Sequence, residues 1–242
     1  MDIQNIKRSI VYSILLTVYT TTTYAEWKAI VIAGSKAQPV FDNARMTISG
    51  MLDEKGIDNR TLTSDEIFTT IDPSVDTATP MNIVKATNSM RRKINDKCFI
   101  YITSHGSKDA GIAMMEKLAT PAILDTYINN ACRGAPAVIV ISACYSGQFI
   151  DRGGFARSDR IILTASHKDR TSFGCSNDRV YTFYDACFIE NFDELGSWEN
   201  LHNRVSKCVT KKENEINAYL KSKGKKLLLP SEPQFFKGSL IN

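Results

Sequence analysis

The chain has 242 residues, of which 43% are hydrophobic and 23% charged, as is usual for a soluble globular protein. Its formal net charge of +4 at pH 7 is too small to predict a nucleic-acid-binding protein. The length suits one large domain, and the absence of low-complexity tracts and internal repeats excludes disordered, fibrous and repeat architectures.

The N-terminal residues have the pattern of a secretory signal. Lys7 and Arg8 precede the apolar run 10–19, and a polar stretch follows that ends at Ala25. The apolar run is too short to cross a bilayer core of about 30 Å as a helix. We therefore expect cleavage after Ala25, a mature domain over residues 26–242, a periplasmic or secreted location, and no stable membrane insertion after cleavage.

Apolar runs of strand length then alternate with segments of helical periodicity. The expected strands cover residues 27–33, 59–63, 97–103, 137–142 and 160–165. The expected helices cover residues 41–55, 81–94, 181–191 and 198–221, with another from Thr120 to Gly134-Ala135-Pro136. Residues 72–80 are expected to form a loop, and residues 228–238 a loop and an edge strand. This alternation predicts an α/β fold with a mostly parallel sheet of five or six strands, covered by helices on both faces.

Two residues with catalytic chemistry follow neighbouring predicted strands. His105 comes directly after strand 97–103, and Cys144 comes directly after strand 137–142. The carboxyl ends of parallel strands share one rim, and adjacent strands lie about 5 Å apart, so the imidazole and the thiol are expected to meet. A single Cys or His is more often structural, but their matching positions favour a functional pair.

A thiol beside an imidazole predicts nucleophilic catalysis. The imidazole favours the thiolate, which attacks a carbonyl, and His105 then protonates the leaving amine and activates water. The backbone N–H groups of Gly106 and Cys144 are expected to bind the oxyanion. No cofactor is required.

The segments around both residues carry a resemblance to a known family. The sequences TSHGS at 103–107 and ISACYSG at 141–147 resemble the His-Gly and Ala-Cys motifs of the legumain family of cysteine peptidases, in the caspase-like clan. Further similar segments are 33–35, 41–45, 163–175 and 231–234. The resemblance implies a caspase-like three-layer α/β/α sandwich, a Cys144–His105 dyad, and peptide or protein substrates.

The resemblance also assigns a specificity pocket. The positions that match it are Asp42, Ser142, Ser172 and Asp185, with Ser166 as a further lining residue. Legumain has Glu where this chain has Ser142, and an Arg-His pair where this chain has Phe41-Asp42. Two carboxylates in the pocket favour cleavage after Arg or Lys over cleavage after Asn. Alternatively, Asp42 is a helix N-cap and Asp185 is a charge on an exposed helix face.

The six cysteines predict disulfides in an exported chain. If Cys144 is a working thiol, at least one other cysteine is free or pairs between chains. One or two disulfides are expected among Cys98, Cys132, Cys175, Cys187 and Cys208. Their spacing does not match a zinc site, so no metal is expected.

Three functions are compatible with these residues. The first is a cysteine endopeptidase, the second a transpeptidase or transamidase that uses the same dyad, and the third a non-catalytic peptide-binding protein on the same fold. The first two differ in whether water or an amine resolves the thioester. The presence of Cys144, His105 and Gly106 favours an enzyme. The sequence makes no prediction of the oligomeric state.

Overall fold

A seven-stranded sheet forms the centre of the protein, whose computed structural model describes residues 26–90, 96–115, 117–129, 131, 136–192 and 197–241. The strand order is β10-β9-β8-β4-β1-β2-β3, and all neighbours are parallel except β10, which is antiparallel to β9. The strands are β1 (Trp27–Ala33), β2 (Asp58–Thr63), β3 (Asp76–Thr77), β4 (Lys97–Thr103), β8 (Ala137–Ser142), β9 (Arg160–Thr164) and β10 (Gln234–Lys237).

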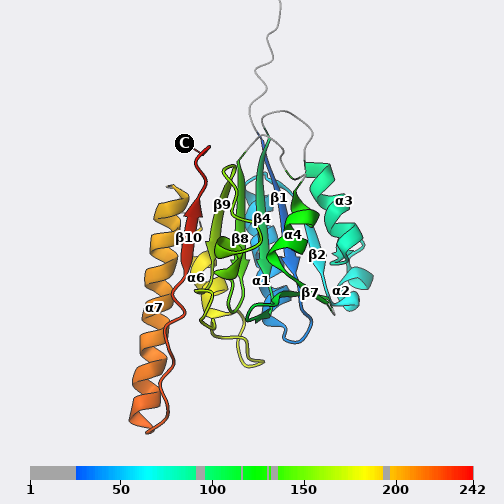
Figure 1. Cartoon of the computed structure of the whole chain (residues 1–242). Coiled ribbons are helices and arrows are strands. Elements are labelled where there is room, and N and C mark those ends of the chain that lie inside the picture. Colours follow the sequence, from blue (N-terminus) through cyan, green and yellow to red (C-terminus); the bar gives the residue numbers. More distant parts are fainter. Residues whose placement is uncertain are drawn as a thin grey trace, which may run out of the picture.

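Helices cover both faces of this sheet, which confirms the predicted α/β sandwich (Figure 1). Helices α3 (Pro80–Met90) and α4 (Pro121–Ile128) pack on one face, and α1 (Val40–Glu54), α6 (Phe183–Asn191) and α7 (Trp198–Ser222) pack on the other. Two short helices, α2 (Glu66–Ile71) and α5 (Gln148–Asp151), complete the set in the described part of the chain. Figure 1 shows α7 beside the edge strand β10 and extending beyond the strands.

The alternation of side chains along β4 shows how the sequence builds this two-sided core. Ile100 and Ile102 pack with the α3 and α4 helices, whereas Phe99 and Tyr101 pack with α6 and α7. Successive side chains of a strand point to opposite faces, so a strand buried on both sides must be apolar at every position. The sequence of β8, AVIVIS, is buried along its whole length for the same reason.

The number of strands differs from the prediction. Five or six were expected and the sheet has seven, because Asp76 and Thr77 pair with Leu62 and Thr63 at the edge, in a segment predicted to be a loop. A two-residue strand has no hydrophobic period for sequence analysis to detect. The edge strand expected in residues 228–238 is confirmed as β10.

A second, three-stranded sheet was not predicted. It consists of β5 (Gly106–Ser107), β6 (Gly111–Met114) and β7 (Lys117–Ala119), all antiparallel, directly after His105. The N–H of Ala113 donates to the carbonyl of His105, and that of Met115 donates to the carbonyl of Gly34. The small sheet therefore lies across the carboxyl ends of β4 and β1.

Several expectations concern residues outside the described ranges. They are the signal segment 1–25, the end of the helix predicted at 81–94, and the end of the helix predicted from Thr120. No helix among the described residues is long and apolar enough to span a membrane.

Candidate functional site

The rim formed by β4 and β8 carries the predicted dyad. The two strands are adjacent and parallel, with Thr103 paired to Ser142, and the Ser104 N–H donates to the Ser142 carbonyl at 3.0 Å. His105 and Cys144 each lie two residues beyond that last pair. The register of the sheet therefore places both residues at the same level of one rim.

Gly106 brings the two motifs into backbone contact. A Cβ atom on Gly106 would overlap the carbonyl oxygen of Cys144 and would lie 3.1 Å from its nitrogen. The bond from Ala113 to His105 makes Gly106 and Ile112 a non-hydrogen-bonded pair of the antiparallel ladder. The Gly106 N–H is thus left outside that ladder, beside the backbone of Cys144.

His105 is half-buried and held on two sides. Its Nε2 lies 2.5 Å from Oε1 of Gln38, and its ring meets that of Phe41 edge to face at 4.9 Å between centroids. An amide oxygen only accepts, so Nε2 carries the ring proton and Nδ1 is the basic nitrogen. Burial lowers the pKa of His105, which keeps the imidazole neutral and able to accept a proton.

The Cys144 sulfur is surrounded by hydrogen-bonding groups. The Ser172 N–H donates to Sγ at 3.3 Å, and the Ser172 carbonyl lies 3.5 Å from the same atom. A hydrogen bond from the Cys175 thiol is the main reason why the pKa of Cys144 falls to about 7, against the opposing effect of burial. Donors to a thiolate stabilise the charged form, so this sulfur is a stronger nucleophile at neutral pH than an ordinary thiol.

The backbone turns sharply just after Cys144. Tyr145 has a φ of +57°, in the left-handed region that non-glycine residues rarely adopt, and its N–H donates to the carbonyl of Arg170 at 2.8 Å. Such conformations cost about 1–3 kcal/mol and are concentrated at functional sites. The turn presents Cys144 at the end of β8.

Asp185 and Ser142 belong to one buried network behind this rim. The Asp185 carboxylate is fully buried and accepts from Tyr101 at 2.7 Å and from Thr103 and Thr182 at 2.8 Å each. Ser142 Oγ lies 3.5 Å from Thr182 Oγ1. Burial raises the pKa of Asp185, and the hydroxyl donors act in the opposite direction. The interpretation of Asp185 as a charge on an exposed helix face is wrong.

Asp42 lies in a separate buried network. Its carboxylate accepts from Arg45 Nε at 2.7 Å and from Thr63 Oγ1 at 3.1 Å, and both charged side chains are only 3% exposed. The interpretation of Asp42 as an N-cap is wrong, because the N-cap position of α1 is Pro39. Its charge is compensated by Arg45, which leaves no unpaired carboxylate at this position.

The other two predicted pocket residues contact Cys144 or the turn that carries it. Ser172 touches the Cys144 sulfur through its backbone, as described above. Ser166 is fully buried, and its hydroxyl donates to the Ala143 carbonyl at 3.1 Å and accepts from the Ser146 N–H at 3.2 Å. Ser166 therefore supports the turn that carries Cys144.

More than half of the chain matches the model of one protein family. The model of the Peptidase C13 family, the legumain family of cysteine peptidases, matches residues 75–221. This span covers more than half of the chain and includes His105 and Cys144. The chain belongs to the Peptidase C13 family. The matched span begins after Gln38 and Asp42, so it includes neither residue. The comparison with curated proteins gives no match.

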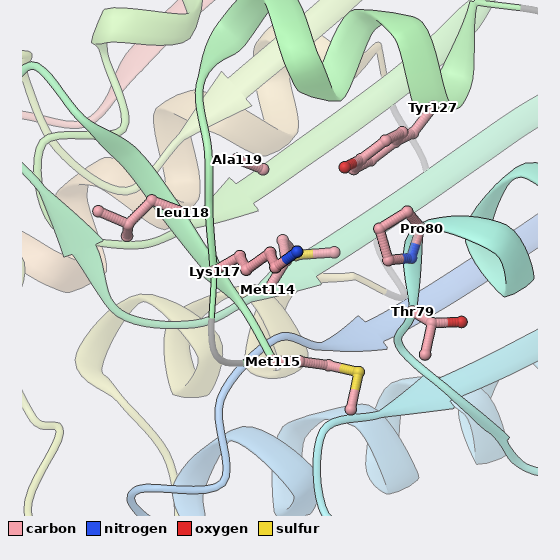
Figure 2. A pocket seen from close by; sticks show the side chains of 8 residues that line it. All are labelled: Thr79, Pro80, Met114, Met115, Lys117, Leu118, Ala119 and Tyr127. Atoms are coloured by element: carbon pink, nitrogen blue, oxygen red, sulfur yellow. The ribbon is translucent and has the colours of Figure 1, made fainter.

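An apolar cavity of this family member lies away from the predicted dyad (Figure 2). Its volume is about 270 Å³, and its walls come from the β6–β7 turn, α4 and the start of α3. Figure 2 shows the side chains of Met114, Met115, Leu118 and Tyr127 around it. It is mostly apolar, and neither Cys144 nor His105 lines it.

The cysteines confirm part of the disulfide prediction. Cys187 and Cys208 form a disulfide between α6 and α7, and Cys98 is also disulfide-bonded. Cys132 lies outside the described residues. One cluster of potential metal ligands occurs in the described ranges, and it combines Cys187 and Cys208 with Glu190. Because these two sulfurs are bonded to each other, they are not available as thiolate ligands.

Sequence reasoning missed Gln38 and the position of Cys175. Gln38 follows β1 on the same rim as His105, and a search for polar residues after each strand could have found it. Cys175 was considered only as a disulfide candidate. No local pattern indicates that its loop returns to Cys144.

Proposed function

We propose that this member of the Peptidase C13 family is an exported cysteine endopeptidase in which Cys144 is the nucleophile and His105 is the acid and base. The observation that carries the proposal is the contact of Gly106 with the Cys144 backbone, which brings both motifs to one point of the rim. The lowered pKa of the Cys144 thiol supports the same assignment.

The proposed mechanism follows from this arrangement. His105 takes the thiol proton of Cys144 on Nδ1, the resulting thiolate attacks the peptide carbonyl, and the N–H groups of Gly106 and Cys144 bind the oxyanion. His105 gives a proton from Nδ1 to the leaving amine, and a thioester forms. His105 then takes a proton from water, which attacks the thioester and releases the acid product and the thiolate. Gln38 accepts from the Nε2–H group throughout, so that Nδ1 is the nitrogen that takes and gives the proton.

A covalent probe tests the dyad. An acyloxymethyl ketone is expected to label the wild-type protein at Cys144 and to leave Cys144→Ala unlabelled. His105→Ala is expected to lower peptide hydrolysis by a factor of about 100 or more, whereas His167→Ala, which changes a loop histidine, serves as the matched control. Equal labelling of Cys144→Ala and wild type would overturn the proposal.

For specificity, we propose a polar residue before the cleaved bond, with Arg or Lys and Asn as the candidates. The support is the Asp185 and Ser142 network close behind the nucleophile. The Asp42–Arg45 pair weakens the argument for a basic residue, because only one of the two carboxylates lacks a cationic partner. Cleavage of a mixed peptide library gives the preference directly, and selection of apolar residues would contradict a polar pocket.

Whether water or an amine resolves the thioester is measured in the same assay. We propose hydrolysis, and a peptide nucleophile added in excess would be incorporated into the product if transpeptidation competes.

The export proposal rests on the signal pattern of residues 1–25 and is supported by the disulfide between Cys187 and Cys208, since such bonds persist in oxidising compartments. N-terminal sequencing of the protein from the periplasm or the medium is expected to begin at Glu26. Retention of the first 25 residues in the cytosol would contradict export.

A further inference from the structure

Cys175 is a second free thiol at the catalytic rim that the proposed mechanism does not use. Among the described cysteines, Cys144 and Cys175 are both free and both partly accessible to solvent. Cys175 follows three residues after Ser172, whose backbone N–H contacts the Cys144 sulfur, and the Cys175 side chain lowers the pKa of the Cys144 thiol. The side chain of Cys175 also packs against the cluster of Val40 and Phe41, next to His105. The nucleophile therefore has a thiol as its immediate neighbour.

The loop that carries Cys175 is fixed at this place. Ser172 is held on the Cys144 sulfur, and the Phe183 N–H donates to the Phe173 carbonyl at 2.9 Å. Gly174 has a φ of +95°, and a Cβ atom there would lie 2.8 Å from the Phe183 nitrogen. Only glycine fits this turn, which directs Cys175 back toward the rim.

We propose that Cys144 and Cys175 form a reversible intramolecular disulfide, and that this modification switches the peptidase off. The inference rests on the proposed function, because it takes Cys144 as the nucleophile. A disulfide bond is about 2 Å long, so the two sulfurs must come into bonding distance, and rotation of the two partly exposed side chains is the smallest movement that can bring them together.

A low-molecular-weight disulfide is the class of oxidant that fits this pair. The Cys144 thiolate attacks one sulfur of the oxidant, and the other sulfur leaves as a thiolate, so that Cys144 is held in a mixed disulfide. The Cys175 thiolate then attacks the Cys144 sulfur and displaces the second thiolate of the oxidant. Two protein thiols lose two protons and two electrons, and the oxidant is reduced to two thiols.

The groups around the two thiols indicate which cysteine attacks the oxidant first. The thiolate of Cys144 is stabilised by its neighbours, so it attacks first. Hydrogen bonding to Cys144 raises the pKa of Cys175, because the proton of Cys175 is shared with that thiolate. Once Cys144 is in a mixed disulfide, its negative charge is gone, and Cys175 loses its proton more easily. Cys175 is thus the resolving cysteine.

Oxidised glutathione applied to the purified full chain tests this. After acid trapping and alkylation, trypsin places Cys144 on the peptide 134–152 and Cys175 on the peptide 171–179. Mass spectrometry is expected to find these peptides linked, while probe labelling of Cys144 falls by at least about tenfold and returns after dithiothreitol. A wild type that carries a stable glutathione on Cys144, with no linked peptide, would overturn the proposal.

Two variants that lack the Cys175 thiol test its role as the resolving cysteine. Cys175→Ser and Cys175→Ala are both expected to retain glutathione on Cys144, because the resolving thiol is gone, and agreement between them supports the proposal even if one folds poorly. Equal resolution of the adduct in wild type and both variants would contradict it. The linkage is measured without reference to activity, so the two proposals fail separately. An active peptidase without the linkage overturns the switch, whereas a linkage in a protein that never labels overturns the proposed function.

Discussion

Gly106, the residue after His105, lies directly against the backbone of Cys144, so main-chain contact holds the two motifs at one point. This contact involves no side chain of Gly106, and it depends on the absence of one. The positions of the Gly106 and Cys144 N–H groups, which we propose as oxyanion donors, are therefore sensitive to the smallest substitution at position 106.

Gly106→Ala is expected to lower kcat/KM for peptide hydrolysis by a factor of about 100 to 1000, because the added Cβ displaces the Cys144 carbonyl and with it one oxyanion donor. Gly50→Ala is the matched control. Gly50 lies in α1 with no atom near its potential Cβ, so this change is expected to add about 0.5–1 kcal/mol of stability and leave activity unchanged. Full turnover of Gly106→Ala would show that the contact is not required.

Gln38 is expected to act through His105. Gln38→Ala removes the acceptor on Nε2 and frees the imidazole, which is expected to lower turnover by a factor of up to about 100. Gln38→Glu places a carboxylate there, which stabilises the imidazolium, raises the pKa of His105 and shifts the acid limb of the pH profile to higher pH. Lys36→Ala, at an exposed residue of the same loop, is the control. An unchanged acid limb in Gln38→Glu would contradict this role.

The reactivity of the thiol is expected to depend on pH with a midpoint near 7, the pKa of Cys144. The thiolate reacts, so the rate of alkylation by iodoacetamide rises as pH increases through that value. Cys175→Ala removes the main donor to the thiolate, so the midpoint is expected to move upward. A midpoint that stays in place or falls in this variant would show that Cys175 does not stabilise the charge.

The buried Asp185 is expected to contribute to stability through its hydroxyl donors. Tyr101→Phe removes one donor from a buried carboxylate and is expected to cost about 1.5–3 kcal/mol in the free energy of unfolding, measured with urea. Tyr219→Phe, at a residue that is 59% exposed, is expected to change little. Similar losses in both variants would mean that the network is not a stabilising one.

The sequence predicted the central part of this structure because strong periodic signals define it. The strands that carry His105 and Cys144 are buried on both faces, and their nearly continuous apolar sequences could not be solvated as loops. The position of the pair then follows from the rule that parallel strands share a carboxyl rim. This rule needs no side-chain detail.

The parts that sequence reasoning missed depend on contacts between distant segments. Asp42 and Arg45, which form an ion pair, are only three residues apart in the sequence. Whether this pair is buried nevertheless depends on how α1 packs and on the contact with Thr63 in β2. The small sheet after His105 has strands of two to four residues, which are too short for a period. The approach of Cys175 to Cys144 depends on the path of an irregular loop, which no hydrophobic pattern specifies.

The pairing of β4 with β8 also has a consequence for folding kinetics. His105 and Cys144 belong to segments far apart in the sequence. They come together only when β4 and β8 have paired in the register that places Thr103 opposite Ser142. Pairing of parallel strands that are distant in the sequence is slow, because the chain loses loop-closure entropy before the stabilising contacts form. We therefore expect the lowered pKa of the Cys144 thiol to arise only late in folding, after the central sheet has paired.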